Sequence, residues 1–199
     1  MRGRLIALEG GEASGKTTQA AILAHRMNAV LTREPGGTPL GERIRSLLLD
    51  PEVTSLDARA ETLLVAADRA QHVAEVIRPA LEAGRDVVTD RYAPSSLAYQ
   101  GHGRGLPVDE VSHVSEWAAG GLWPEVVVLV DVPEDVARRR RGGSDRFELE
   151  ERDFHRRVAD GYSQLVAKDP DRWRVVDGTG TVEEVAERVW AAVAGRAER

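Results

Sequence analysis

The chain has 199 residues, enough for one domain with a substantial hydrophobic core, and 42% of them are apolar. Its net charge of −6 disfavours a nonspecific nucleic-acid binder, and the lack of cysteine excludes disulfides and thiolate metal sites. No apolar run approaches the ~20 residues that span a bilayer, and the N-terminus lacks the features of a signal peptide. We therefore expect a cytoplasmic protein that binds neither nucleic acid nor membranes.

Short apolar runs alternate with longer helical stretches, a pattern typical of a parallel sheet covered by helices. Strands are predicted at residues 4–9, 29–32, 86–89, 126–131 and 173–177. Helices are predicted at residues 17–27, 39–49, 57–83, 108–117, 134–141, 151–168 and 182–197. The predicted fold is a three-layer α/β sandwich, in which a five-stranded parallel sheet carries helices on both faces. It forms a single domain over residues 1–199.

The long helix predicted at 57–83 has an apolar stripe spaced by three and four residues, as a core-facing helix has. The stripe consists of Leu63, Ala67, Ala70, Ala74, Ile77 and Leu81. Val65 and Arg69 lie one turn apart and roughly on the opposite side of the helix. A solvated Arg69 is one interpretation, but the valine beside it favours a second, partly covered face.

Residues 10–17 read Gly-Gly-Glu-Ala-Ser-Gly-Lys-Thr and match the phosphate-loop pattern G-x-x-x-x-G-K-[ST] between a predicted strand and a predicted helix. Glycines let backbone N–H groups surround a phosphate at the helix N-terminus. Lys16 is expected to bridge the β- and γ-phosphates, and the Thr17 hydroxyl to hold Mg²⁺. The expected ATP-binding residues are Gly10, Gly11, Glu12, Ala13, Ser14, Gly15, Lys16, Thr17 and Thr18.

An acidic partner for this loop is predicted at Asp90, which follows the strand at 86–89. Ligands of open α/β sheets collect at the carboxyl ends of the strands. We therefore expect the Asp90 carboxylate to support Mg²⁺ together with Thr17, through a water molecule.

Three stretches resemble the successive signatures of bacterial thymidylate kinases, in the order and spacing of that family. They are Thr-Arg-Glu-Pro-Gly-Gly-Thr at 32–38, Ala-Ala-Asp-Arg-Ala-Gln-His at 66–72, and Asp-Arg-Tyr-Ala-Pro-Ser-Ser-Leu-Ala-Tyr-Gln-Gly-His-Gly-Arg-Gly at 90–105. The resemblance runs from the N-terminus to about Asp177. It implies a homodimeric, Mg²⁺-dependent enzyme that transfers the γ-phosphoryl group of ATP to dTMP, giving dTDP for dTTP synthesis.

The resemblance also implies an acceptor site. Arg69 would hydrogen-bond the thymine ring, and Ser96 and Gln100 would lie against the base. Val65 occupies the position at which family members commonly carry a phenylalanine that stacks on thymine. Valine cannot stack, and base–aromatic stacking is worth about 1–3 kcal/mol in single-strand binders. We therefore expect weaker dTMP binding than in a phenylalanine-bearing relative, or a different base in the pocket.

By the same resemblance, Arg91 would hold the acceptor phosphate, and Arg33 is a further candidate for that area. Glu12 would reach the acceptor's sugar, and Tyr99 would lie under the deoxyribose, where its bulk would crowd a 2′-hydroxyl. For both arginines a structural ion pair remains an alternative. For Tyr99 the alternative is a core aromatic residue.

An arginine-rich segment at about 138–150 is interpreted as a lid. Helical spacing distributes Arg138 to Arg141 around a helix, and Gly142-Gly143 then supplies a flexible point. Such a lid would close an arginine over the transferring phosphoryl group. Arg146 is expected to be held by neighbouring acidic residues or to contact the nucleotide.

In this family the catalytic arginine comes from the phosphate loop or from the lid. Ala13 occupies the loop position here, so the resemblance implies the lid arrangement, with Arg139 or Arg141 as candidates. The other expected catalytic residues are Lys16, Arg91 and Glu12. Two alternatives stay open: a kinase of another deoxypyrimidine monophosphate, such as dUMP or a modified base, and a regulatory protein that binds nucleotides without efficient transfer.

Overall fold

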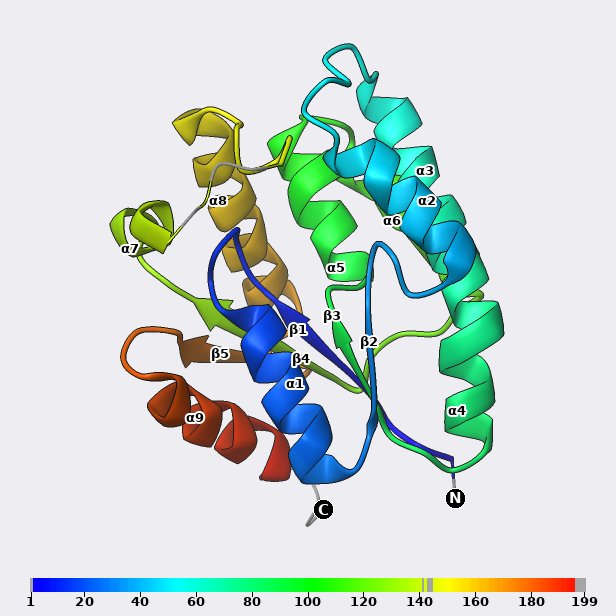
Figure 1. Ribbon diagram of the computed structural model, residues 1–199, viewed down its shortest axis with the longest axis vertical. Coiled ribbons are helices and arrows are strands. Elements are labelled where there is room, and N and C mark those ends of the chain that lie inside the picture. The colour runs from blue at the N-terminus through cyan, green and yellow to red at the C-terminus, as the bar shows by residue number, and fades with distance from the viewer. Residues whose placement is uncertain (1, 141, 143–144, 196–199) are drawn as a thin grey trace.

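The computed structural model describes residues 2–140, 142 and 145–195 (Figure 1). Its centre is a five-stranded sheet in the order β2-β3-β1-β4-β5, with every neighbouring pair parallel. The strands are β1 (Leu5–Glu9), β2 (Val30–Arg33), β3 (Val87–Asp90), β4 (Val126–Asp131) and β5 (Trp173–Asp177). The predicted α/β fold is confirmed, and each strand lies within a residue of its expected bounds.

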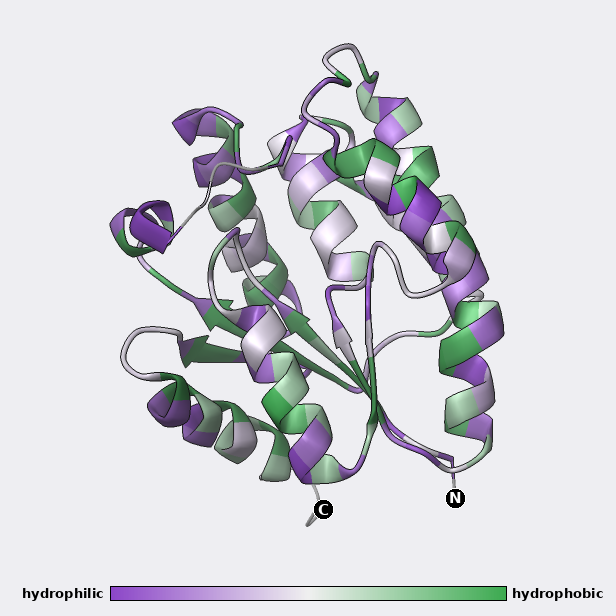
Figure 2. Cartoon of the chain, viewed as in Figure 1, coloured by the Kyte–Doolittle hydropathy of each residue, from purple (hydrophilic) through white to green (hydrophobic). Residues whose placement is uncertain are grey.

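The helices form two layers, because successive side chains of a strand point to opposite faces of the sheet. Ile6 and Leu8 of β1 pack under α1 (Lys16–Met27) and α9 (Val182–Ala194), which contact each other. Leu5 and Ala7 point to the other face. The elements between β2 and β3 and between β3 and β4, together with α8, supply the core on that side. Figure 2 shows the resulting apolar sheet between helices whose outer faces are hydrophilic.

The remaining helices are α2 (Pro39–Leu49), α3 (Ala58–His72), α4 (Arg78–Glu82), α5 (Ala93–Ser96), α6 (Val108–Ala119), α7 (Glu134–Arg140) and α8 (Arg152–Lys168). Two π-helical segments, η1 (Val73–Ile77) and η2 (Leu97–Gly103), continue α3 and α5. The sequence analysis missed α5 and η2. Position 141 of the predicted 134–141 helix, and positions 196–197 of the predicted 182–197 helix, lie outside the described residues. No helix in the described part of the chain is long and apolar enough to cross a membrane.

The apolar stripe predicted on the long helix is wrong for its first four residues. Leu63, Ala67, Ala70 and Ala74 are exposed, and the buried row is Thr62, Ala66, Arg69, Val73, Ile77 and Leu81. The cause is η1, in which the Arg78 N–H donates to the Val73 carbonyl, five residues back. A π turn holds more residues than an α turn, so it shifts the helical phase by one residue.

Candidate active site

The phosphate loop leaves β1 at Gly10 and enters α1 at Lys16. Gly10 has a φ of 150°, and a Cβ there would lie 2.6 Å from the Val130 carbonyl oxygen, so only glycine fits. Ala13 also lies in the left-handed region, with a φ of 57°. Within the described chain, no side chain caps the first turn of α1. Its N–H groups are therefore free to bind an anion.

Lys16 is buried at the mouth of this loop, and its Nζ donates to the Gly11 carbonyl over 3.0 Å. Burial lowers the pKa of its ammonium group, and the nearby Arg91 guanidinium lowers it further, while Glu12 and Asp90 act in the opposite direction. A buried ammonium group whose one hydrogen bond within the described chain goes to a carbonyl is well suited to a phosphate ligand.

Thr17 and Asp90, the two expected metal ligands, lie side by side. The Thr17 hydroxyl donates to Asp90 Oδ2 over 2.5 Å, and Asp90 Oδ1 is buried with no partner among the described residues. A hydroxyl beside a carboxylate oxygen fits Mg²⁺, which prefers oxygen ligands and keeps several waters or phosphate oxygens. The described residues hold no group of three His, Asp or Glu side chains that could hold a metal ion. An ion here would therefore need ligands from the nucleotide and water.

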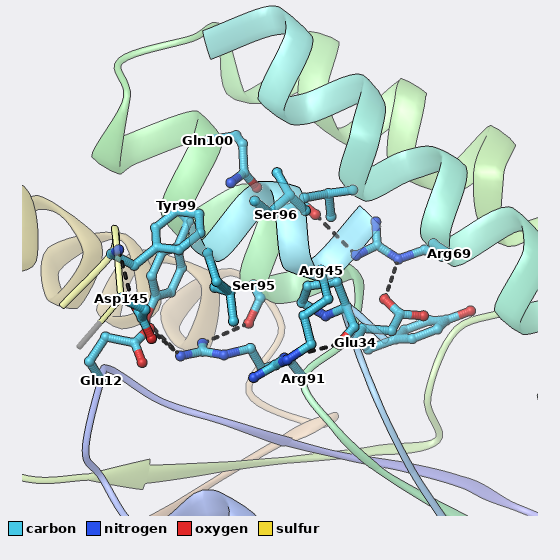
Figure 3. A pocket seen from close by; sticks show the side chains of 16 residues that line it. Glu12, Glu34, Arg45, Arg69, Arg91, Ser95, Ser96, Tyr99, Gln100 and Asp145 are labelled. Atoms are coloured by element: carbon cyan, nitrogen blue, oxygen red, sulfur yellow. Dashed lines mark hydrogen bonds and ion pairs between the residues drawn. The ribbon is translucent and has the colours of Figure 1, made fainter. Parts of the chain in front are cut away.

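A cavity opens between the phosphate loop, α2, α3, η2 and the lid segment (Figure 3). It brings together every expected acceptor residue except Arg33: Glu12, Val65, Arg69, Arg91, Ser96, Tyr99 and Gln100. The sequence analysis missed other residues that line it, including Glu34, Arg45, Tyr92, Ser95 and Phe147. These come from four separate segments, and outside the family-like stretches no local pattern marks them.

Arg91 lies at the charged end of the cavity. Its Nη2 donates to Glu12 Oε1 over 2.5 Å and to the Tyr99 hydroxyl over 2.9 Å, and the Tyr99 hydroxyl also donates to Glu12. Burial raises the pKa of Glu12, but Arg91 and Lys16 outweigh burial and bring it to about 2. Glu12 is therefore a carboxylate at neutral pH. Tyr99 packs edge-on against Phe147 and Phe154, so it is both a core residue and a wall of the cavity.

Behind Arg91 lies Glu9, a buried acid that the sequence analysis did not single out. Its carboxylate accepts hydrogen bonds from the Tyr92 N–H, from Ser95 Oγ and from the Tyr162 hydroxyl, over 2.9, 2.5 and 3.0 Å. Burial raises the pKa of Glu9 to about 7, against the lowering effect of Ser95 and Arg91. Arg91 has a φ of 69°, and the Tyr92 N–H bond to Glu9 supports this strained turn. One feature of the sequence could have indicated Glu9: it is an acidic residue at the end of an otherwise apolar strand.

Arg69 lies at the other end of the cavity and is almost fully buried. Its Nε donates to Glu34 over 2.8 Å, its Nη2 donates to Ser96 Oγ over 3.0 Å, and its guanidinium lies over the Tyr92 ring. Glu34 also contacts His72 Nδ1 over 3.0 Å. Arg69 Nη1 is buried and has no partner among the described residues, so the protein leaves its two N–H groups unsatisfied. The interpretation of Arg69 as a solvated side chain is wrong.

Arg33 is half-exposed outside the cavity, where it forms an ion pair with Glu42 over 2.6 Å. Arg45 of α2 lines the cavity in its place, and its Nη1 donates to the Pro35 carbonyl over 3.0 Å. Burial lowers the pKa of Arg45, and the neighbouring Arg33 lowers it further. Arg45 and Arg91 thus converge on one end of the cavity, which suits an anion (Figure 3).

The lid arginines are placed differently from one another. Arg139 is exposed and pairs with Asp135 over 2.7 Å on the surface of α7, and Arg141 lies outside the described residues. The expectation that neighbouring acids hold Arg146 is corrected. Arg146 donates to Glu61 of α3 over 2.6 Å and to the Leu48 carbonyl of α2 over 2.9 Å. The Asp145 carboxylate instead accepts from two backbone N–H groups of its own turn.

The phosphate loop, the Thr17–Asp90 pair and the adjoining arginine-lined cavity define a phosphate-loop nucleoside monophosphate kinase. The family model described as "Thymidylate kinase" matches residues 8–189, and the chain belongs to the thymidylate kinase family. It is 50% identical to the thymidylate kinase of Thermomicrobium roseum over 94% of this chain and 93% of the relative. It is 47% identical to that of Syntrophotalea carbinolica over 93% and 92%. The crystal structure of thymidylate kinase from Ehrlichia chaffeensis superposes with a TM-score of 0.82 at 30% identity, covering 98% of this chain and 100% of that one.

Proposed function

We propose that this protein transfers the γ-phosphoryl group of ATP to the phosphate of dTMP, giving dTDP and ADP. The observation that carries the proposal is the position of the acceptor cavity. It adjoins the phosphate loop through Glu12, with Arg91 at that end and Arg69 at the other. Its two ends suit the phosphate and the base of one nucleotide.

On the donor side, the open N–H groups of the loop and the Lys16 ammonium hold the β- and γ-phosphates of ATP. Thr17 and Asp90 would hold Mg²⁺, which would neutralise charge on the transferring phosphoryl group. The close Thr17–Asp90 pair and the unpartnered Asp90 Oδ1 support this assignment. Phosphoryl transfer depends mainly on positioning and electrostatic stabilisation, and these residues supply both.

On the acceptor side, Arg91 and Arg45 bind the dTMP phosphate, because both guanidinium groups line the end of the cavity nearest the loop. Glu12 is held as a carboxylate beside Arg91 and accepts from the sugar hydroxyl. The Tyr99 ring supports the deoxyribose. Its contact with Glu12 and its edge-on packing fix its position without a ligand.

At the base end, Arg69 donates its free N–H to the ring, and Ser96 and Gln100 lie against the base. Val65 lines the same cavity, which supports a place for this side chain next to the base. Arg139 or Arg141 acts from the lid on the transferring group. For Arg139 this requires the exposed pair with Asp135 to break as the lid closes.

The protein acts as a homodimer through α3 and α6, which pack against each other. Leu63 on α3 is 60% exposed and Trp117 on α6 is 84% exposed. The small side chains of Ala67, Ala70 and Ala74 are exposed on the same helix as Leu63. Large exposed apolar residues on adjoining helices are typical of a surface that a second subunit covers.

The test is a coupled ADP-release assay with ATP and Mg²⁺ against dTMP, dUMP, dCMP, dGMP, AMP and CMP. Turnover of dTMP well above the others supports the proposal. If dUMP or another acceptor is turned over faster than dTMP, the protein is still a kinase, but the base assigned to the pocket changes. Binding of ATP by folded protein without turnover of any acceptor would favour a regulatory nucleotide-binding protein.

A further inference from the structure

We propose that Glu61 determines which base the acceptor pocket accepts, because it fixes the amide orientation of Gln100. The same carboxylate binds Arg146 of the lid segment, so the orientation of Gln100 and the position of the lid depend on one residue. The inference rests on the proposed function of Arg69 and Gln100 as base contacts. Glu61 itself is not a lining residue of the cavity, so it acts as a positioning residue.

Glu61 lies in the first turn of α3 and is 0% exposed. Its carboxylate accepts from three side chains on two other segments of the chain. Gln100 Nε2 donates to Oε1 over 2.9 Å, Arg104 Nε lies 3.2 Å from both oxygens, and Arg146 Nη2 donates to Oε2 over 2.6 Å. A carboxylate between two guanidinium groups is acceptor-only.

This contact decides the orientation of the Gln100 amide. An amide has one donor end and one acceptor end, and only the NH₂ end can bond to an acceptor-only group. Gln100 must therefore turn its NH₂ toward Glu61 and keep its oxygen for the cavity that it lines. In Figure 3 the oxygen lies on the side of Ser96 and the nitrogen on the opposite side.

The cavity then offers one fixed acceptor, the Gln100 oxygen, and one fixed donor, the unpartnered Arg69 Nη1. Arg69 cannot change its role, because a guanidinium has no acceptor. A pyrimidine that presents a ring N–H next to a carbonyl oxygen complements this pair, as thymine and uracil do. Cytosine presents an amino donor and an unprotonated ring nitrogen. Its amino group would face the Arg69 donor and its ring nitrogen would face the Gln100 oxygen, so neither pair could form a hydrogen bond.

The same carboxylate anchors the lid segment. Arg146 belongs to that segment and donates directly to Glu61. Arg104 contacts both Glu61 and Glu150, and its Nη1 donates to Glu150 Oε1 over 2.5 Å. Among the described residues, Glu61 is therefore the one acceptor shared by Gln100, which contacts the base, and Arg146, which belongs to the lid segment. Loss of the Arg146 contact alone should affect turnover, whereas loss of the Glu61 charge should also relax the choice of base.

The experiment compares kcat/KM for dTMP with kcat/KM for dCMP in the wild type and in Glu61→Gln. A glutamine at position 61 can donate or accept, so the Gln100 amide is free to turn. We expect the dTMP/dCMP ratio to fall by about tenfold or more, the equivalent of about 1.4 kcal/mol. Both substrates are measured in one preparation, so any inactive or unfolded fraction cancels from the ratio.

Three further variants make the result specific to Glu61. Glu150→Gln removes a carboxylate that Arg104 also contacts but that does not touch Gln100, and its ratio should equal that of the wild type. Arg146→Gln combined with Glu61→Gln restores the charge balance of the buried cluster, and its ratio should fall like that of Glu61→Gln. In a Gln100→Leu background, Glu61→Gln should leave the ratio unchanged.

A Glu61→Gln ratio within twofold of the wild type would overturn the inference, as would an equal fall in Glu150→Gln. The same holds if Glu61→Gln lowers the ratio further in the Gln100→Leu background. Wild-type enzyme that fails to phosphorylate dTMP would instead refute the proposed function, so the two failures are distinguishable.

Discussion

Glu9 should make the stability of this protein depend on pH in a way that one substitution removes. The folded protein raises the pKa of Glu9 from its ordinary 4.5 to about 7, because the carboxyl group is fully buried. Between these values the folded protein keeps a proton that the unfolded chain releases. The free energy of unfolding should therefore fall as pH rises from 4.5 to 7, and the contribution should be constant outside that window.

The size of the effect follows from the shift. At 1.36 kcal/mol per pKa unit, ionisation of Glu9 should lower the free energy of unfolding of the wild type by about 3 kcal/mol between pH 4.5 and pH 7. Glu9→Gln keeps the shape and has no ionisable group, so its stability lacks this component. Urea unfolding of both proteins at half-unit steps from pH 4.5 to 8 gives the difference between their free energies of unfolding.

That difference isolates Glu9, because the other shifted groups are common to both proteins. Asp68, whose pKa burial and the nearby Glu34 raise to about 6, cancels in the comparison. We expect the wild type to lose about 3 kcal/mol relative to Glu9→Gln over the window. A difference that stays constant with pH would refute the reasoning, since Glu9 would then titrate alike in the folded and unfolded states.

Three other predictions concern the site and the interface. Lys16→Met should lower kcat by about 10² or more in a steady-state assay, because the donor phosphates lose a buried cation, while circular dichroism stays native. Val65→Phe should lower the KM for dTMP about fivefold or more by stacking on the base, and an unchanged KM would mean that position 65 does not limit binding. Leu63→Arg should place an unpaired charge in the proposed α3–α6 interface and shift sedimentation from dimer to monomer, whereas a monomeric wild type would remove the interface altogether.

The sheet and the geometry of the phosphate loop were predictable from sequence because both depend on local patterns. The strands are short apolar runs, and the phosphate loop lies between its own strand and helix, so the position of Lys16 and Thr17 at the start of α1 depends on local sequence alone. The pairing of Thr17 with Asp90 followed from a general property of parallel sheets, whose carboxyl ends meet at one edge.

Residues of the candidate acceptor cavity were predictable only where they lie in the family-like stretches. Arg33 belongs to such a stretch but lies on the edge strand β2, where its side chain reaches solvent and Glu42. Arg45 has no motif around it and enters the cavity because α2 packs across α3. Glu61 was missed for the same reason, since its three partners are 39 to 85 residues away in sequence.

The π segment η1 affects which single-residue insertions and deletions the protein tolerates in its long helix. In a regular helix each residue advances the side-chain direction by about 100°. Deleting one residue between Val73 and Ile77 would return this turn to an α-helical repeat and keep the buried faces of α3 and α4 aligned, because the π turn holds the extra residue. Arg69 would then stay on the side of the cavity and Leu81 on the side of the core. A loss of one codon at this place should therefore be tolerated better than the loss of one residue in the regular part of α3 after Arg69, which would rotate Arg69 by about 100° relative to α4.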